Sequence, residues 1–271
     1  MQSNEQKEEY VMENHVVSEL MRDYIYMLSS KGRRHDGRKF DEYRPIKIKK
    51  NHILSAEGSC EVSIGSTRVV VGIKLEPGTP FPDTPTTGVL ITNAELVPMA
   101  SPTFEAGPPN EDSVELARVV DRGLRESKCI NMEKLCIQPG EKVWMVFVDI
   151  HILDYDGNLF DASFLASMIA LCNTKIPLKK YNLGEDVPLQ IDHYPVECTL
   201  AKIGNALLVD PGLEEELVAD ARLTIAIDEN GDICAVQKGN PGALTIEDIT
   251  KSINIASASA IKLREYLKNE N

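Results

Sequence analysis

The sequence is poor in positive charge and lacks the residue spacings of a metal site or a disulfide framework. Its 29 lysines and arginines are outnumbered by 42 aspartates and glutamates, so the formal net charge is −13 at pH 7. No two of the six cysteines have C-x-x-C spacing and the five histidines are scattered, so no metal site is predicted. Disulfides are not expected in a 271-residue chain that can bury a real core. A nucleic-acid partner would need a local basic patch, because the overall field repels it.

Long apolar runs are also missing. No stretch of about 18 apolar residues is present, so no membrane span is expected. The first ten residues, MQSNEQKEEY, are polar and acidic and do not form a signal-peptide pattern. Hydrophobic residues make up 42% and charged residues 26% of the chain, as in ordinary globular proteins. We therefore expect a cytoplasmic protein with no membrane partner.

The apolar pattern predicts an α+β protein in two halves. Helical spacing is found in residues 9–30, 108–128, 159–173 and 245–267. Strand patterns are found in residues 52–76, 88–98, 141–154, 196–211 and 221–239. We expect an N-terminal helix plus a first half in residues 1–183 and a second half in residues 184–271.

Two short segments resemble each other, and several helix ends have capping residues. VSIGSTRVVVGI (62–73) and LAKIGNALLVDP (200–211) each place an apolar run after an Ile-Gly turn, which hints at an internal repeat. Asn110 or Asp112 is expected to cap the helix of residues 108–128. Thr245 with Asp248 forms a capping-box pattern at the start of the last helix.

The stretch ILDYDGNLFDAS (152–163) has a Gly-Asn turn that leads into a helix. Such a turn offers backbone N–H groups to an anion, yet this one carries acids and no Arg or Lys. Asp154, Asp156 and Asn158 have the opening spacing of a calcium loop, but Leu159 and Leu165 stand where that loop needs Gly and Glu. The favoured interpretation is that Asn158 caps the helix and that Asp161 stabilises its first turn.

Several stretches resemble the RNase PH family of phosphorolytic 3′-exoribonucleases, and most of all the non-catalytic ring subunit of the archaeal exosome. They are DGRKFDEYRPI (36–46), AEGSCEVSIGSTRVVVGIK (56–74), PNEDSVELARVVDRGLRESK (109–128), DYDGNLFDASFLASMIAL (154–171) and GNALLVDPGLEEE (204–216). The resemblance implies the RNase PH fold (ribosomal protein S5 domain 2-like), with two βαβ-type halves, mixed sheets and packed helices.

The resemblance also implies a degenerate phosphate site. In catalytic members the turn carries Gly-Ser-Arg or Gly-Thr-Arg and holds inorganic phosphate. Here it reads Gly157, Asn158 and Leu159, and Leu159 supplies no charge. The resemblance makes Asp210 and Glu216 the counterparts of the catalytic acids. We expect both to be solvated, so no catalytic residue is assigned. The alternative is an enzyme in its own right that uses Asp210 or Glu216 with a differently built phosphate site.

Three arginines form the candidate RNA contact. Arg118, Arg122 and Arg125 lie at i, i+4 and i+7, within about 60° of one another on a helix. Pairs Asp121–Arg125 and Glu115–Arg118 are expected to compensate part of this charge. A solvated helix face is the plain alternative, but the resemblance implies contact with RNA phosphates, which suits the planar donor fork of arginine.

The resemblance further implies the partners. These are a catalytic RNase PH-type subunit, which alternates with this chain as three heterodimers in a hexameric ring and uses inorganic phosphate, then RNA-binding cap subunits and single-stranded RNA. No cofactor is expected for this chain itself. The basic stretch at residues 31–39 is expected to meet water or the partner subunit rather than RNA.

Overall fold

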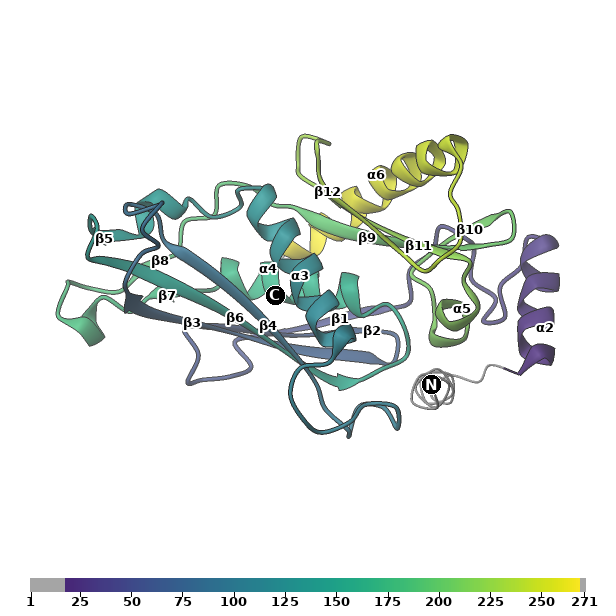
Figure 1. Ribbon diagram of the computed structural model, residues 1–271, viewed down its shortest axis with the longest axis horizontal. Coiled ribbons are helices and arrows are strands. Elements are labelled where there is room, and N and C mark those ends of the chain that lie inside the picture. Colours follow the sequence, from purple (N-terminus) through teal and green to yellow (C-terminus); the bar gives the residue numbers. More distant parts are fainter. Residues whose placement is uncertain (1–17, 269–271) are drawn as a thin grey trace, which may run out of the picture.

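The structure is a computed structural model that describes residues 18–268 (Figure 1). Its elements in chain order are α2 (Glu19–Ser30), β1 (Ile46–Lys50), β2 (Gly58–Ile64), β3 (Thr67–Gly78), β4 (Val89–Leu96), α3 (Glu111–Glu126), β5 (Cys136–Gln138), β6 (Lys142–Asp154), α4 (Leu159–Cys172), β7 (Lys175–Ile176), β8 (Val187–Pro188), β9 (Val196–Ile203), β10 (Ala206–Val209), α5 (Leu213–Val218), β11 (Ala221–Ile227), β12 (Ile233–Gly239) and α6 (Ile246–Lys268).

Two main sheets enclose a helical layer. The first sheet has the order β1-β2-β3-β6-β4, with β4 parallel to β6 and β5 added at the end of β6. The second sheet, β10-β9-β11-β12, is antiparallel throughout. Helices α3 and α4 lie between the two sheets and contact both, whereas α6 packs against the second sheet (Figure 1). The predicted α+β class is therefore confirmed.

The suspected internal repeat is present as two matching hairpins. Ile64 pairs with Thr67 and Ile203 pairs with Ala206, so each hairpin closes through a two-residue turn that begins with glycine. Both glycines, Gly65 and Gly204, have φ of 60°, a left-handed conformation that residues with a side chain rarely adopt. The repeated Ile-Gly dipeptide thus marks the same turn in both halves.

Helix α4 is the centre of the core. Its residues from Phe160 to Leu171 are all buried, because the helix contacts β2 and β3 on one side and β9 and α6 on the other. One hydrophobic cluster runs through both halves of the chain. The short β7–β8 pair also joins residues on either side of position 183. The division at residues 183 and 184 stays a prediction.

Most predicted elements are found, with a few differences at short elements. The described part of the N-terminal helix begins at Glu19 with Ser18 as its cap, and residues 9–17 of the predicted helix lie outside the described residues. The short strands β1, β5, β7 and β8 and the six-residue helix α5 were not predicted. Within residues 18–268, no helix combines the length and the apolar character needed to cross a membrane.

Candidate functional site

The turn between β6 and α4 has a left-handed backbone at two successive residues. Gly157 has φ of 85°, and a Cβ there would lie 2.6 Å from the backbone of Gly212 and Leu213, so only glycine fits. Asn158 has φ of 53°, and its side chain accepts a hydrogen bond from the backbone N–H of Asp161. The prediction that Asn158 caps the helix is confirmed.

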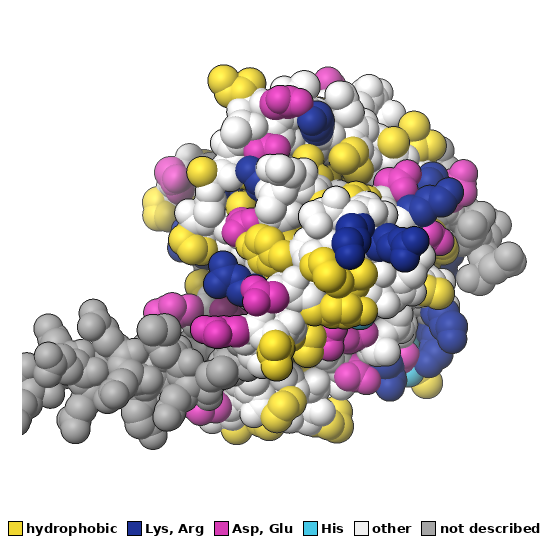
Figure 2. All heavy atoms as spheres, turned by 90° about the vertical axis from the view of Figure 1, so that its right-hand side faces the viewer, with side chains coloured by type: hydrophobic (Ala, Val, Ile, Leu, Met, Phe, Trp, Pro, Cys, Tyr) yellow, Lys and Arg dark blue, Asp and Glu magenta, His cyan; other side chains and the backbone are white. Residues whose placement is uncertain are grey.

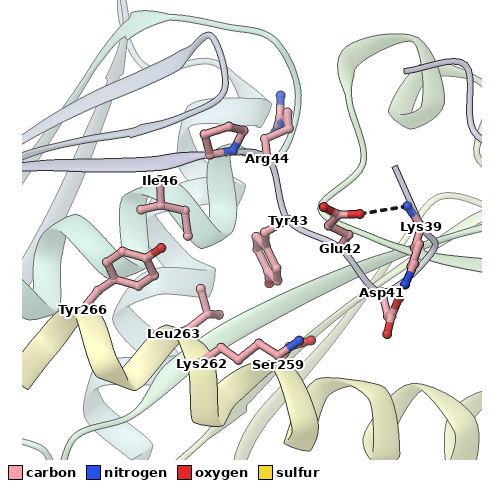
Figure 3. Close-up of a pocket in the computed structure, with 11 residues that line it drawn as sticks. Lys39, Asp41, Glu42, Tyr43, Arg44, Ile46, Ser259, Lys262, Leu263 and Tyr266 are labelled. Carbon is pink, nitrogen blue, oxygen red and sulfur yellow. Dashed lines mark hydrogen bonds between the residues drawn. The ribbon is translucent and has the colours of Figure 1, made fainter. Parts of the chain in front are cut away.

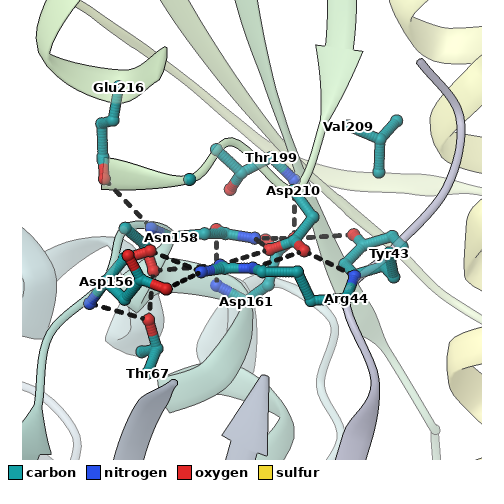
Figure 4. Close-up of polar contacts among 12 residues, drawn as sticks. Tyr43, Arg44, Thr67, Asp156, Asn158, Asp161, Thr199, Val209, Asp210 and Glu216 are labelled. Carbon is teal, nitrogen blue, oxygen red and sulfur yellow. Dashed lines mark hydrogen bonds and ion pairs between the residues drawn. The ribbon is translucent and has the colours of Figure 1, made fainter. Parts of the chain in front are cut away.

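A cation from a distant segment occupies this turn. Arg44, just before β1, donates to the backbone oxygens of Asp156 and Gly157 (Figure 4). Its guanidinium also pairs with Asp210, with Nε 2.9 Å from Oδ2 and Nη2 2.7 Å from Oδ1. The acids near this turn are therefore offset by a cation from a distant segment, which the sequence of the turn itself does not contain. The Asn158 side-chain oxygen of the calcium-loop pattern is already used, because it accepts the hydrogen bond from the Asp161 N–H.

Asp210 is buried rather than solvated, which corrects the expectation from the sequence. Its side chain is 0% exposed and also accepts hydrogen bonds from Arg38 Nη1 (2.9 Å) and Asn158 Nδ2 (2.8 Å). Burial alone would raise the pKa of Asp210, but the hydrogen bonds and charge of Arg44 outweigh burial and lower it. Asp210 is thus an ionised carboxylate whose two oxygens are already engaged.

Glu216 is also drawn into the protein instead of pointing to water. From α5, its Oε2 accepts a hydrogen bond from the backbone N–H of Asn158 at 3.0 Å (Figure 4). The Tyr155 hydroxyl donates to the same oxygen at 3.3 Å. Its side chain is 15% exposed. Burial raises the pKa of Glu216, and the Asn158 N–H and the charge of Arg222 oppose that rise. The backbone N–H of Asn158 is therefore already bound to an acceptor of the protein itself, the carboxylate of Glu216.

A third acid ties the helix to the second sheet. Asp161, in the first turn of α4, accepts hydrogen bonds from the Tyr43 hydroxyl (2.6 Å) and the Thr199 backbone N–H (3.1 Å). Burial raises the pKa of Asp161 to about 6, although these hydrogen bonds act in the opposite direction. Thr199 lies in β9, so the contact joins the two halves of the chain.

Two arginines of the basic stretch at residues 31–39, Arg34 and Arg38, make internal contacts, whereas most of the stretch is exposed. Arg34 is fully buried, donates to Glu215 through Nε (2.8 Å) and donates to the backbone oxygen of Val209 (2.9 Å). Arg38 binds Asp210, as described above. At this end of the molecule, Figure 2 shows basic side chains in small groups among acidic and hydrophobic ones. The sequence pattern did not reveal that Arg34 and Arg38 are used internally.

The segment after this stretch lines a cleft against α6. A cavity of about 520 Å³ lies between residues 39–46 and the C-terminal half of that helix. Figure 3 shows Tyr43 pointing toward α6, where Leu263 and Tyr266 form the opposite wall. The cavity does not include the turn at residues 157–159.

Among residues 18–268, one group of potential metal ligands lies close together, away from the turn at residues 157–159. Atoms of His193, Asp228 and Glu229 lie within 4.8 Å of one another, a grouping that sequence spacing did not indicate. The His193 ring is hydrogen-bonded to Glu229 (2.9 Å). Asp228 accepts from the backbone N–H groups of Asn230 and Asp232, as in an ordinary hairpin turn.

The arginine stripe lies on the exposed face of α3, whose N-cap is Asn110 as predicted. Arg118 has no hydrogen bond or ion pair with any of the described residues, and Arg122 donates to Gln237 Oε1 at 2.9 Å. Arg125 is paired with Asp121, at 3.0 Å. The apolar residues predicted on the opposite side are buried: Leu116, Ala117, Val120 and Leu124.

One predicted compensation on this helix is wrong. Glu115 forms its ion pair with Arg222 of β11, at 2.5 Å, instead of with Arg118. Arg118 and Arg122 therefore have no acidic partner among the described residues, whereas Arg125 is paired with Asp121. The stripe thus offers two uncompensated guanidinium groups to an anionic ligand.

Family models match both halves of the chain. Residues 42–177 match the 3′ exoribonuclease family, domain 1 (RNase PH), and residues 193–259 match domain 2 of the same family. These matches cover more than half of the chain, so the protein belongs to the RNase PH family. Its fold is the RNase PH fold, as the sequence motifs implied.

Individual relatives are similar over nearly their whole length. The exosome complex component Rrp42 of Methanocella arvoryzae is 54% identical over 257 residues, which is 95% of this chain and 99% of that protein. A chain of the Archaeoglobus fulgidus exosome with RNA bound to the active site is 51% identical, with a TM-score of 0.89 over 91% of this chain and 97% of that one. A chain of an archaeal exosome core is 47% identical, with a TM-score of 0.86 over 93% of this chain and 97% of that one.

Proposed function

We propose that this chain is a non-catalytic ring subunit of an exosome that degrades RNA from the 3′ end by phosphorolysis. The observation that carries this proposal is the occupied turn before α4. Leu159 brings no charge to it, Arg44 is neutralised by Asp210, and Glu216 accepts from the Asn158 N–H. A phosphate ion would find neither a free cation nor a free backbone donor at Asn158. The names of the similar proteins and structures support membership of an exosome.

In this proposal the chemistry belongs to the neighbouring subunit. There, inorganic phosphate attacks the 3′-terminal phosphodiester and a nucleoside diphosphate leaves. The present chain alternates with that catalytic RNase PH-type subunit as three heterodimers in a hexameric ring, to which RNA-binding cap subunits attach. We propose no cofactor for this chain itself. Its cytoplasmic location stays a prediction.

The role of this chain is to hold single-stranded RNA through the stripe on α3. Arg118 and Arg122 tolerate a like-charge contact at i, i+4, which an anionic phosphate would convert into an attraction. Phosphate contacts carry no base information, so the contribution is expected to be independent of sequence. Arg125 contributes less, because Asp121 already neutralises it.

The alternative, in which this chain is catalytic through Asp210 or Glu216, is less well supported. A general acid needs a proton to give and a free path to the leaving group. Asp210 is held ionised by Arg44 and is fully buried. Phosphate-dependent shortening of a 3′-tailed RNA by the pure chain would establish this alternative and contradict the proposal.

The RNA-binding role is tested by changing Arg118 and Arg122 together to alanine in the assembled ring. Each lost phosphate contact should reduce the slope of log affinity against log salt by about 0.7, so the double variant should lose up to about 1.4. The matched control is Arg125→Ala on the same helix, for which a clearly smaller change is expected. RNA affinity is measured over a range of salt concentrations. A double variant with the parent affinity and slope would show that the stripe is only a solvated face.

A further inference from the structure

The N-terminal turn of α4 contains an acceptor that the chain itself supplies. Backbone N–H groups at a helix N-terminus are not satisfied within the helix, and together with the helix dipole they attract anions. Here the Asn158 N–H donates to Glu216 Oε2 at 3.0 Å, and the Tyr155 hydroxyl donates to the same oxygen at 3.3 Å. One carboxylate oxygen thus lies where an oxygen of a bound anion would be placed by this N–H.

The position of Glu216 is held by the rest of α5. Glu215, its neighbour, is buried, pairs with Arg34 and accepts from the Gly212 N–H at 3.0 Å. The backbone at Gly212 is so close to Gly157 that a single added Cβ would not fit between them. Helix α5 is therefore packed directly against the turn, and Glu216 cannot withdraw without a shift of that helix or a change of its own rotamer.

Space for a small ligand does exist beside the turn, but its chemistry is unsuited to phosphate. A cavity of about 310 Å³ is lined by Tyr155, Leu159 and Glu216 together with Asp112 and Glu115. Its one cation, Arg222, is bound to Glu115 at 2.5 Å and lies 4.0 Å from Glu216. Three acids therefore surround a guanidinium that is already paired.

We infer that Glu216 is a specificity-determining residue, whose carboxylate fills the anion position of the turn and excludes inorganic phosphate from this subunit. This inference rests on the proposed function, which it deepens by assigning the exclusion to a residue other than Leu159. Restoring a cation at position 159 alone should then fail to restore a phosphate site. Removing the charge at position 216 should allow phosphate to compete for the Asn158 N–H.

The test compares phosphate binding by variants of the pure chain, measured by isothermal titration calorimetry with inorganic phosphate at pH 7. The variants are Leu159→Arg alone, Leu159→Arg with Glu216→Gln, and Leu159→Arg with the matched control Glu214→Gln on the same helix. We expect the double variant Leu159→Arg/Glu216→Gln to bind phosphate about tenfold to a hundredfold tighter than Leu159→Arg alone or Leu159→Arg/Glu214→Gln. This range corresponds to one charge-assisted hydrogen bond. A folded Leu159→Arg/Glu216→Gln variant that binds no tighter than Leu159→Arg would overturn the inference.

A second measurement needs no engineered phosphate site. The charged or titratable groups around Glu216 are Tyr155, Arg222 and Arg44, with Asp112 and Glu115 on the same cavity, and Asp161 is hydrogen-bonded to the Asn158 side chain. Because several carboxyl groups lie nearby, the contribution of Glu216 is isolated by comparing the wild-type chain with the Glu216→Gln variant. The amide resonance of Asn158 in the wild-type chain should shift with pH through a step whose pKa lies above the ordinary value of a glutamate, and Glu216→Gln should remove that step. An Asn158 amide that does not respond to pH, or that responds equally in the variant, would contradict the inference.

The proposed function is tested separately from this residue. Phosphorolysis of RNA by the pure wild-type chain would contradict the non-catalytic role, whatever the variants bind. If the pure chain is inactive but phosphate binding does not depend on position 216, only the inference about Glu216 fails.

Discussion

Replacing Asp210 with asparagine separates a structural role of this acid from a catalytic one. The residue has φ of 47°, a left-handed conformation that asparagine tolerates as well as aspartate does. The substitution also keeps the volume of the side chain. What it removes is the negative charge that faces Arg44 and Arg38, so the measured effect reports the ion pairs rather than backbone strain or a cavity.

The expected loss of stability follows from burial. The Asp210 side chain is 0% exposed and that of Arg44 is 9% exposed, so neither charge can turn to water when its partner is lost. The new amide group would also face the donors Arg44 Nη2 and Asn158 Nδ2, which now bind Oδ1. Breaking a buried pair in this way costs about 3–5 kcal/mol of the free energy of unfolding.

Urea denaturation of the purified chain at pH 7 measures this loss, and Asp156→Asn is its matched control. Asp156 is 45% exposed and lies 3.4 Å from Arg44, so its substitution should cost less than about 1 kcal/mol. Phosphorolysis by the reconstituted ring, measured where the variant is still folded, should stay close to that of the parent.

Two results would refute the reasoning. A loss below about 1 kcal/mol would mean that the Arg44–Asp210 pair does not hold the turn. A variant that keeps its stability but abolishes phosphorolysis by the ring would instead show that Asp210 takes part in the chemistry.

Two further predictions concern buried charges. Burial raises the pKa of Asp161 from 3.8 to about 6 in the folded chain, so the folded state keeps a proton that the unfolded chain has lost. The free energy of unfolding should therefore fall by about 2 kcal/mol as pH rises from 4 to 7. Asp161→Asn should remove that part of the pH dependence in urea titrations at the two pH values, and an unchanged profile would contradict it. Arg34→Met should cost about 3–5 kcal/mol in the same assay, because Glu215 would be left buried without its partner. The exposed neighbour Arg33 should tolerate the same change within about 0.5 kcal/mol, and equal losses would show that burial is not the cause.

Features that depend on a few consecutive residues were predictable from the sequence. The caps at Asn110 and Asn158 and the reciprocal bonds of Thr245 with Asp248 join groups three residues apart, so their pattern is visible in the chain itself. The exposed arginine stripe of α3 follows from helical periodicity in the same way. The family could be recognised because its motifs are continuous in sequence.

Contacts between distant segments were not predictable, and these decide the candidate site. Acids near a strand end are usually solvated, so Asp210 and Glu216 were expected in water. The residues around Asp210 in the sequence do not indicate that it pairs with Arg44 and Arg38. In the same way, the residues around Glu115 do not indicate its ion pair with Arg222. Helix α5 was missed because six residues are too few to show a helical period.

The sequence by itself therefore determined the family, the repeated hairpins, the helix caps and the absence of a cation at position 159. Only the tertiary structure decided that the turn before α4 is filled from within the chain. The physical reason is that electrostatic partners are chosen by distance in space and by the loss of water around them. The segment of Arg44 and helix α5 reach the turn only when the two sheets close over α4, and that proximity is not recorded in the spacing of residues along the chain.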